Sequence, residues 1–299
     1  MTPSVLRDNL QAFEIPGRVT LLKGKGDLMK IDVHTDWSTA QVYLHGAHVT
    51  GFQKKGEPPL LFTSSFSRFA SGQAIRGGIP VIFPWFGPRV GEPAHGFARL
   101  KNWELREATE APEGGVSLRF HLPPETGGPW ASCSVNYVVT ITDSLSLELI
   151  VTNTTDRGQL IFENCLHTYF ALEDIAAVSI SGLKGVDYLD KVDNYIPKND
   201  AAQDIRIASE VDRTYLATTA PVEILDSKLR RKIRIKKIGS ASTVVWNPWA
   251  AKAQKMTDFG DEEYRQMVCV ESGNVGPDKI ELGPAKSSVL KVNITSEAI

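Results

Sequence analysis

Residues 134–153 read Ser-Val-Asn-Tyr-Val-Val-Thr-Ile-Thr-Asp-Ser-Leu-Ser-Leu-Glu-Leu-Ile-Val-Thr-Asn. Every second residue is apolar on both sides of Asp143-Ser144, and most of the residues between them are polar. A period of two is typical of a strand with one buried face, and Asp-Ser favours a turn between two strands. The stretch therefore predicts an antiparallel hairpin in which each strand buries one face.

The same period of two recurs on both sides of this hairpin. It is found at residues 42–44, 103–105, 116–122, 178–180, 233–235 and 290–294. Long stretches of helical period are absent, and Gly, Pro, Asn and Asp separate the short runs. This pattern predicts an all-β protein, a large antiparallel β-sandwich with few short helices. Because no linker or charge block divides the sequence, we expect one domain over residues 1–299.

The first 17 residues are the exception to the strand pattern. Val5, Leu6, Leu10 and Phe13 have the spacing of one short amphipathic helix, which Pro16-Gly17 would end. The segment contains no apolar run of signal-peptide length. We expect residues 1–17 to form an N-terminal extension packed on the domain.

The composition excludes several classes of function. Among 299 residues, 33 are basic and 35 acidic, which gives a formal net charge of −2 without a basic cluster for nucleic acid or anionic membrane. No stretch approaches the roughly 20 apolar residues that span a bilayer. Cys133, Cys165 and Cys269 are odd in number and widely spaced, which favours reduced thiols in a cytoplasmic protein. No coiled-coil pattern is present, and we expect a monomer.

Two glycine-containing segments carry cations or histidines that could meet a ligand. Arg76 precedes Gly77-Gly78, where it could present a fork of donors to an anion or simply lie on the surface beside a tight turn. His95 and Arg99 lie four residues apart around Gly96. A neutral ring and a permanent cation suit a polar substrate with an anionic tail, although histidine is often only a buried, hydrogen-bonded residue.

A histidine and a glutamate end two apolar runs. His167 follows Leu166 beside an aromatic pair, where partial burial could hold its pKa near neutrality, and the alternative is a satisfied core histidine. Glu271 ends the run Val268-Cys269-Val270. Buried glutamates are rare unless they are paired or functional, and burial would raise the pKa of Glu271 and make it a competent general base.

Three further groups of residues have ambiguous roles. Trp246, Asn247 and Trp249 could stack on and hydrogen-bond a sugar ring, although tryptophan clusters are more often part of a core. Asp212 has the local sequence of a solvated turn carboxylate. In His45-Gly46-Ala47-His48 a strand would turn the two rings to opposite faces, and without a third ligand nearby we expect no metal site.

Taken together, these motifs resemble the aldose 1-epimerase (galactose mutarotase-like) superfamily, and within it the glucose-6-phosphate 1-epimerase or hexose-6-phosphate mutarotase branch. The resemblance runs from about residue 40 to the end of the chain, with the motifs in the family's order. The matching elements are Arg76-Gly77-Gly78-Ile79-Pro80 with Phe83-Pro84 and Phe86-Gly87, His95-Gly96-Phe97-Ala98-Arg99, His167-Thr168-Tyr169-Phe170, Val211-Asp212 followed by Tyr215, Trp246-Asn247-Pro248, and Cys269-Val270-Glu271.

The resemblance implies a galactose mutarotase-like supersandwich and a set of site residues. It implies that His167 and Glu271 are catalytic. It also implies that the substrate is bound through Arg76 and Arg99 on the phosphate side, His95, Asp212 and the Asn247 motif. No metal or other cofactor is implied. Many relatives place Gln before the His-Gly pair, and here that position is Ala94, so one substrate hydrogen bond is in question.

The implied reaction interconverts the α and β anomers of an aldohexose 6-phosphate, most readily glucose 6-phosphate. Ionised Glu271 would take the C1 hydroxyl proton, protonated His167 would donate to the ring oxygen, and His95 would polarise that oxygen. The alternatives are an aldose 1-epimerase for unphosphorylated sugars and a non-catalytic carbohydrate-binding protein. A glycosidase would instead need two carboxylates.

Overall fold

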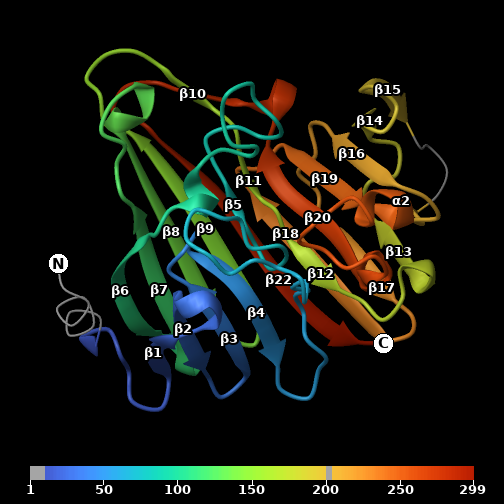
Figure 1. Ribbon diagram of the computed structural model, residues 1–299, viewed down its shortest axis with the longest axis horizontal. Helices are drawn as coiled ribbons and strands as arrows, with labels where there is room; N and C mark the ends of the chain where they lie inside the picture. Colours follow the sequence, from blue (N-terminus) through green and yellow to red (C-terminus); the bar gives the residue numbers. More distant parts are fainter. Residues whose placement is uncertain (1–10, 200–203) are drawn as a thin grey trace.

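The computed structural model describes residues 11–199 and 204–299, and it is built from antiparallel sheets (Figure 1). Two of the sheets have eight strands each. The first sheet has the order β13 (Val178–Ser181), β17 (Val222–Asp226), β18 (Arg231–Ile238), β22 (Ser287–Ala298), β9 (Leu145–Asn153), β8 (Cys133–Ile141), β7 (Gly115–Leu122) and β6 (Glu104–Ala111).

The second sheet contains shorter strands and lies on the right in Figure 1. Its order is β15 (Ile196–Asn199), β14 (Asp187–Asp190), β16 (Val211–Tyr215), β19 (Ser242–Asn247), β20 (Met267–Asn274), β11 (Asn164–Leu166) and β5 (Val81–Ile82), and β12 (Tyr169–Ala171) also pairs with β20. Two smaller sheets join β1 (Val19–Lys23), β2 (Met29–His34), β3 (Ser38–Tyr43) and β4 (His48–Lys54), and β10 (Leu160–Phe162) with β21 (Ile280–Leu282).

Helical segments in the described residues are short. The α-helix α2 covers Trp249–Ala253, and 3-10 turns cover Lys25–Asp27, Ala98–Leu100, Pro112–Gly114, Pro129–Ser132, Ile175–Ala177, Glu263–Gln266 and Gly276–Asp278. No helix in the described part of the chain is both long and apolar enough to cross a membrane. The predicted all-β class with few short helices is confirmed.

The hairpin predicted from residues 134–153 is β8 and β9, paired from Cys133↔Asn153 to Ile141↔Leu145. Along both strands buried and half-buried residues alternate without a break, because the pleat sends successive side chains to opposite faces. The buried side chains join one hydrophobic cluster to which all three larger sheets contribute.

The N-terminal helix predicted over Val5, Leu6, Leu10 and Phe13 falls largely on residues 1–10, which lie outside the described residues. Within the described part, Phe13 and Ile15 are partly buried and pack against the main hydrophobic cluster. These contacts are consistent with the expected position of residues 11–17 on the body of the protein.

Strand β20 differs from β8 and β9 because all eight of its residues are buried. Val268 and Val270 face the main hydrophobic cluster. Successive residues point to opposite faces, so Cys269 and Glu271 lie on the other face of the strand. This second buried face is where the candidate site forms.

Candidate active site

A cavity of about 420 Å³ opens on the face of the second sheet that carries Glu271. Segments far apart in the sequence meet there. The lining residues are Arg76, Phe86, Gly87, Pro88, His95, His167, Lys191, Tyr195, Asp212, Trp246, Lys252, Met256 and Glu271. The cavity therefore brings together five of the seven site residues predicted from the sequence: Arg76, His95, His167, Asp212 and Glu271.

His167 lies at the junction between β11 and β12, both of which pair with β20. Its backbone N–H donates to Pro80 O at 3.1 Å, and the N–H of Tyr169 donates to Gly78 O at 2.9 Å. These bonds fix the junction against residues 78–80. The glycine at 78 is required for packing, since a Cβ there would lie 2.3 Å from Val49 O. The glycine pair thus serves a close backbone approach within the protein.

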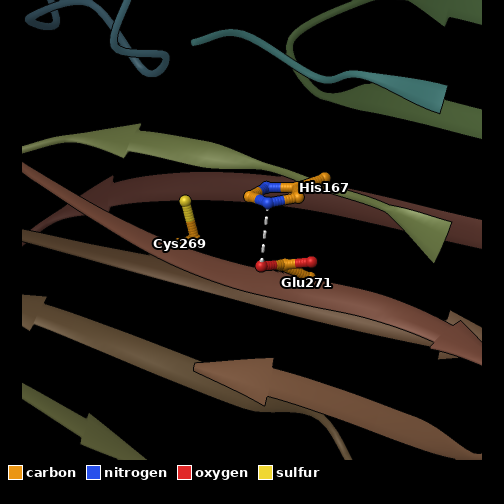
Figure 2. Close-up of side chains that lie close together, drawn as sticks. All are labelled: His167, Cys269 and Glu271. Atoms are coloured by element: carbon orange, nitrogen blue, oxygen red, sulfur yellow. Dashed lines mark ion pairs between the residues drawn. The ribbon is translucent and has the colours of Figure 1, made fainter. Parts of the chain in front are cut away.

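His167 and Glu271 form a buried pair (Figure 2). Nε2 of His167 lies 3.3 Å from Oε1 of Glu271, and the two residues are 7% and 1% exposed. The imidazole stacks on the Tyr169 ring, with centroids 4.8 Å apart and planes at 11°. On the other side of the carboxylate, the Cys165 thiol donates to Oε2 at 3.6 Å. Both partners of the pair are therefore held in fixed orientations.

Burial governs the protonation of this pair. Burial raises the pKa of Glu271 to about 8, a rise that Asp212 reinforces and Lys191 opposes. Burial also lowers the pKa of His167 well below its ordinary value, and His95, Arg99 and Arg76 lower it further. Burial therefore favours the uncharged form of both groups in the free protein.

His95 faces the same cavity as a neutral ring. Burial, together with Arg99, Lys191 and Arg76, lowers its pKa to about 2. The backbone N–H of Gly87 donates to Nδ1 of His95 at 3.3 Å, so Nδ1 is an acceptor and the ring proton lies on Nε2. His95 is therefore a neutral hydrogen-bond donor, with its ring centroid 5.7 Å from that of His167.

Arg76 reaches the cavity already paired. Its Nε and Nη2 donate to the carboxylate of Asp258 at 3.1–3.2 Å, and Nη1 donates to the Tyr169 hydroxyl at 3.1 Å. Burial opposes the charge, but Tyr169 and Asp258 outweigh it and raise the pKa of Arg76 above its ordinary value. Arg76 is a fixed, permanent cation at the cavity wall.

Asp212 lies in the cavity on β16, opposite Trp246 in the register of the sheet. Its Oδ1 lies 3.2 Å from Lys191 Nζ, which also stands 4.3 Å from the centre of the Phe86 ring. Lys252 pairs with Glu210 in the same way, at 2.8 Å. Arg76, Lys191 and Lys252, which line the cavity, are thus each paired with the carboxylate of another residue.

The aldose 1-epimerase family profile matches residues 29–295. This chain belongs to the aldose 1-epimerase family. It is 36% identical to a provisionally named glucose-6-phosphate 1-epimerase of Cenchrus ciliaris over 249 residues, 79% of this chain and 75% of that protein. It is equally identical to one of Escherichia coli (strain K12) over 246 residues, 78% of this chain and 79% of that one.

Solved structures agree with this assignment. The crystal structure of YeaD from Salmonella typhimurium, provisionally named a mutarotase, superposes on this aldose 1-epimerase family member with a TM-score of 0.86. The two are 29% identical, and the superposition covers 98% of this chain and all of that one. The family and the galactose mutarotase-like fold predicted from the sequence are confirmed.

Two predicted site residues of this family member lie outside the cavity lining. Arg99 is half-buried; its Nη2 donates to Ala94 O at 2.8 Å, and its Nε has no hydrogen-bond partner among the described residues. Burial lowers the pKa of Arg99 to about 10, so the side chain stays a cation at neutral pH. Arg99 acts on the cavity through its charge, which influences both His95 and His167.

Asn247 is buried and its amide is occupied within the protein. Nδ2 donates to Tyr264 O and Met267 O at 2.8 and 2.9 Å, and Oδ1 accepts from the Trp249 N–H at 2.9 Å. The predicted hydrogen bond to a sugar therefore has no free donor here. The Asn247 amide instead ties α2 and the start of β20 beneath the cavity, and Trp246 is the member of this motif that lines it.

Sequence reasoning missed Lys191, Tyr195, Asp258 and the role of Cys269. Lys191, Tyr195 and Asp258 lie in segments without a local signal, and only the tertiary fold brings them near His167. The sequence predicts Cys269 only as a reduced thiol, yet it shares a face of β20 with Glu271. One oxygen of Glu271, one nitrogen of His167 and the sulfur of Cys269 all lie within 4.8 Å of one another, a spacing that could hold a metal ion.

His45 and His48, the other pair of histidines considered from the sequence, each contact a backbone carbonyl. His45 contacts the carbonyl of Gln73, and His48 contacts that of Gly77.

Proposed function

We propose that this aldose 1-epimerase family member interconverts the α and β anomers of an aldohexose 6-phosphate, with glucose 6-phosphate as the most suitable substrate. The observation that carries the proposal is the buried His167–Glu271 pair at 3.3 Å on the floor of a 420 Å³ cavity. Ring opening requires one proton removed from O1 and one delivered to the ring oxygen. A coupled acid and base with a single proton between them supply both.

Glu271 is the proposed base and His167 the proposed acid. In the free protein the proton lies on Glu271, and the short Oε1–Nε2 separation lets it pass to His167. Glu271 then accepts the C1 hydroxyl proton while His167 protonates the ring oxygen and the C1–O5 bond breaks. The aldehyde rotates about C1–C2 and closes on its other face with the roles reversed. His95 donates from Nε2 to the ring oxygen, and Asp212 accepts from sugar hydroxyls.

The substrate phosphate would favour this redistribution of the proton. Arg99 and Arg76 both lower the pKa of His167 in the free protein. A phosphate dianion beside these arginines offsets their charge, so the pKa of His167 rises and the ion pair with Glu271 becomes more favourable. Binding at one end of the sugar thereby prepares the acid and the base at the other end.

The charge balance of the cavity supports a phosphorylated substrate. Arg76, Lys191 and Lys252 each pair with one carboxylate, whereas Arg99 has no carboxylate within salt-bridge distance among the described residues. Glu271 adds no charge at neutral pH because its pKa lies near 8. Positive charge is therefore in excess, which attracts an anionic group and steers it to the cavity.

Exchange NMR on glucose 6-phosphate tests the reaction directly. We expect the protein to accelerate exchange between the anomeric proton signals well above the spontaneous rate. An unchanged exchange rate would contradict the enzymatic proposal and would favour a carbohydrate-binding protein that holds the sugar in this cavity. A glycosidase would release a product from an alkyl glycoside, which this mechanism does not cleave.

The phosphate preference has its own test in Arg99→Gln, which removes the positive charge and leaves a shorter side chain whose amide can still donate a hydrogen bond. We expect kcat/KM for glucose 6-phosphate to fall about 10-fold to 100-fold, because the variant removes a positive charge that attracts the phosphate to the cavity. Turnover of free glucose should change much less. Equal kcat/KM for free galactose and glucose 6-phosphate in the unchanged protein would instead favour an aldose 1-epimerase for unphosphorylated sugars.

We also propose that the protein works as a monomer in the cytoplasm and acts on its sugar substrate without nucleic acid or membrane. The three cysteines are free and buried, which suits a reducing compartment. The proposed mechanism uses only residues of one chain around one cavity. Size-exclusion chromatography with light scattering would check the oligomeric state.

A further inference from the structure

Three side chains of the types that can bind a metal ion lie close together at the proposed catalytic pair, and the proposed reaction uses only two of them. Figure 2 shows His167 and Cys269 on the same side of Glu271, with Cys269 two residues before Glu271 on β20. One donor atom from each residue lies within 4.8 Å of the other two. Cys269 is fully buried, and neither the proton transfer nor the binding of the sugar needs its sulfur.

We propose that His167, Cys269 and Glu271 form a binding site for a thiophilic divalent cation, Zn²⁺, and that its binding shuts off the proton-transfer pair. The inhibitory part of this proposal rests on the proposed epimerase function. The metal site itself does not. Imidazole nitrogen, thiolate sulfur and carboxylate oxygen are the donors that Zn²⁺ takes in proteins, whereas Mg²⁺ prefers oxygen ligands alone.

The separation of the His167 and Glu271 donor atoms fits a tetrahedral centre. Zn–N and Zn–O bonds of about 2.0–2.1 Å place two such ligand atoms about 3.3 Å apart. Nε2 of His167 and Oε1 of Glu271 already have this separation of 3.3 Å. A Zn–S bond of about 2.3 Å requires the sulfur at about 3.6 Å from the other donors. The sulfur lies within 4.8 Å of both, so it would have to approach them by at most about 1.2 Å.

The geometry of the pair presents two donor atoms to the same point. Nε2 of His167 and Oε1 of Glu271 face each other at 3.3 Å. These two atoms are the ones that a metal ion would take, so Zn²⁺ would lie between them. Cys269 would bind as a thiolate, and its thiol proton would be released to water. The cavity beside His167 and Glu271 leaves the fourth position open to water.

Zinc at this site must inhibit. Ring opening needs Nε2 of His167 and Oε1 of Glu271 to exchange protons with the sugar, and both atoms would be bound to the metal. Because the metal and the sugar meet at the same floor of the cavity, they should compete. The activity of the epimerase would therefore depend on the concentration of free Zn²⁺, and this dependence would arise from Cys269, a residue that takes no part in the proposed reaction.

The test compares two cysteine variants with the unchanged protein under buffered free Zn²⁺. We expect Zn²⁺ to inhibit glucose 6-phosphate anomer exchange, Mg²⁺ to have no such effect, and higher sugar phosphate to relieve the inhibition. Cys269→Ser should need at least about 10-fold more Zn²⁺ for the same inhibition, since losing even an outer partner of a metal ligand costs that much. Cys133→Ser, another buried thiol at the start of β8, should behave like the unchanged protein.

Binding of Co²⁺ tests the site without any activity. We expect a thiolate-to-cobalt charge-transfer band with one ion per chain in the unchanged protein and in Cys133→Ser, and none in Cys269→Ser. Cys269→Ala gives the same comparison if the serine variant unfolds, and thermal melting checks that each variant is folded. Equal zinc sensitivity of Cys269→Ser, or a cobalt complex without the band, would overturn the site. An enzyme without exchange activity but with the band would overturn only the inhibition.

Discussion

Strands β9 and β20 show how the two large sheets differ in burial: β9 has one buried face, and β20 has two. On β9 in the first sheet, buried residues such as Leu147 alternate with half-buried ones such as Glu148. On β20 in the second sheet every residue is buried, so Glu271 lies between two packed faces. Glu148 finds a surface partner in Lys291 at 2.6 Å, whereas Glu271 meets a histidine and a thiol.

This contrast separates the scaffold from the chemistry. A strand with one solvent-exposed face can carry a carboxylate at little cost in free energy, because the carboxylate stays in contact with water. A strand buried on both faces forces its carboxylate to take up a proton or to find a partner. The protein therefore has two glutamates on comparable strands with opposite consequences, and substitutions at both measure the difference.

The largest effect should come from Glu271→Gln set against Glu148→Gln. We expect Glu271→Gln to lower kcat for glucose 6-phosphate exchange about 10²-fold to 10⁴-fold, because the amide cannot accept the C1 hydroxyl proton. Glu148→Gln removes the same charge from the first sheet and should leave kcat within twofold. Exchange NMR on both variants checks this.

Comparable losses in both variants would contradict the division between the sheets, since the effect would then follow charge and not position. Full activity in Glu271→Gln would show that another group is the base. His167→Ala separates the two partners, because it keeps Glu271 and removes the acid.

The first sheet could be predicted from the sequence almost strand by strand. Its alternation is visible at Leu145, Leu147 and Leu149 because water on one face imposes a polar residue at every second position. The second sheet gives no such signal, since both faces of β20 are buried and only the misplaced Glu271 marks it. A catalytic role for His167 could be predicted only from the whole ordered set of motifs, because a histidine at a strand end is more often a core residue.

Tertiary proximity decides the parts of the site that the sequence could not reveal. Lys191 lines the cavity and Asp258 pairs with Arg76. Both come from loops whose local sequence is typical of a surface, so the sequence alone does not reveal their pairing with Asp212 and Arg76. Asn247 illustrates the converse, because its amide is hydrogen-bonded within the protein. An amide in a motif can serve the backbone as well as a substrate, and only its hydrogen bonds distinguish the two.

The second-largest expected effect is a loss of stability caused by a substitution in the first sheet. Leu147 is fully buried in the middle of β9, and we expect Leu147→Ala to reduce the free energy of unfolding by about 2–5 kcal/mol. Leu225→Ala on β17 of the same sheet makes the same chemical change at a side chain that is 39% exposed, and it should cost much less. Urea unfolding monitored by tryptophan fluorescence gives both values.

Activity per folded molecule should survive in Leu147→Ala at a temperature where the variant is folded. A loss of kcat as large as that of Glu271→Gln would mean that the first sheet takes part in the chemistry beyond its support of the second. An unfolding free energy equal to that of the Leu225 variant would contradict the packing of β9.

The smallest effect is a gain in stability in the second sheet that depends on pH. The pKa of Glu271 is raised from 4.5 to about 8 in the folded protein. A raised pKa means that the folded state holds this proton more tightly, so the stabilisation is complete below about pH 4.5 and is lost as the pH rises through 8. Glutamine does not titrate. Above pH 8 we therefore expect Glu271→Gln to exceed the unchanged protein in unfolding free energy by about 0.5–2 kcal/mol, an ordinary gain from relieving a functional site.

Below pH 5 the same two proteins should differ little, because both then bury a neutral side chain at this position. Urea unfolding at pH 5, 7 and 9 measures the gap, and Glu148→Gln on β9 serves as the reference, with a change that stays within about 0.5 kcal/mol throughout. A gap that stays constant or narrows as the pH rises would mean that Glu271 is ionised in the free protein. The proton would then not start on the carboxylate, and the acid in the first step would already be charged before the sugar binds.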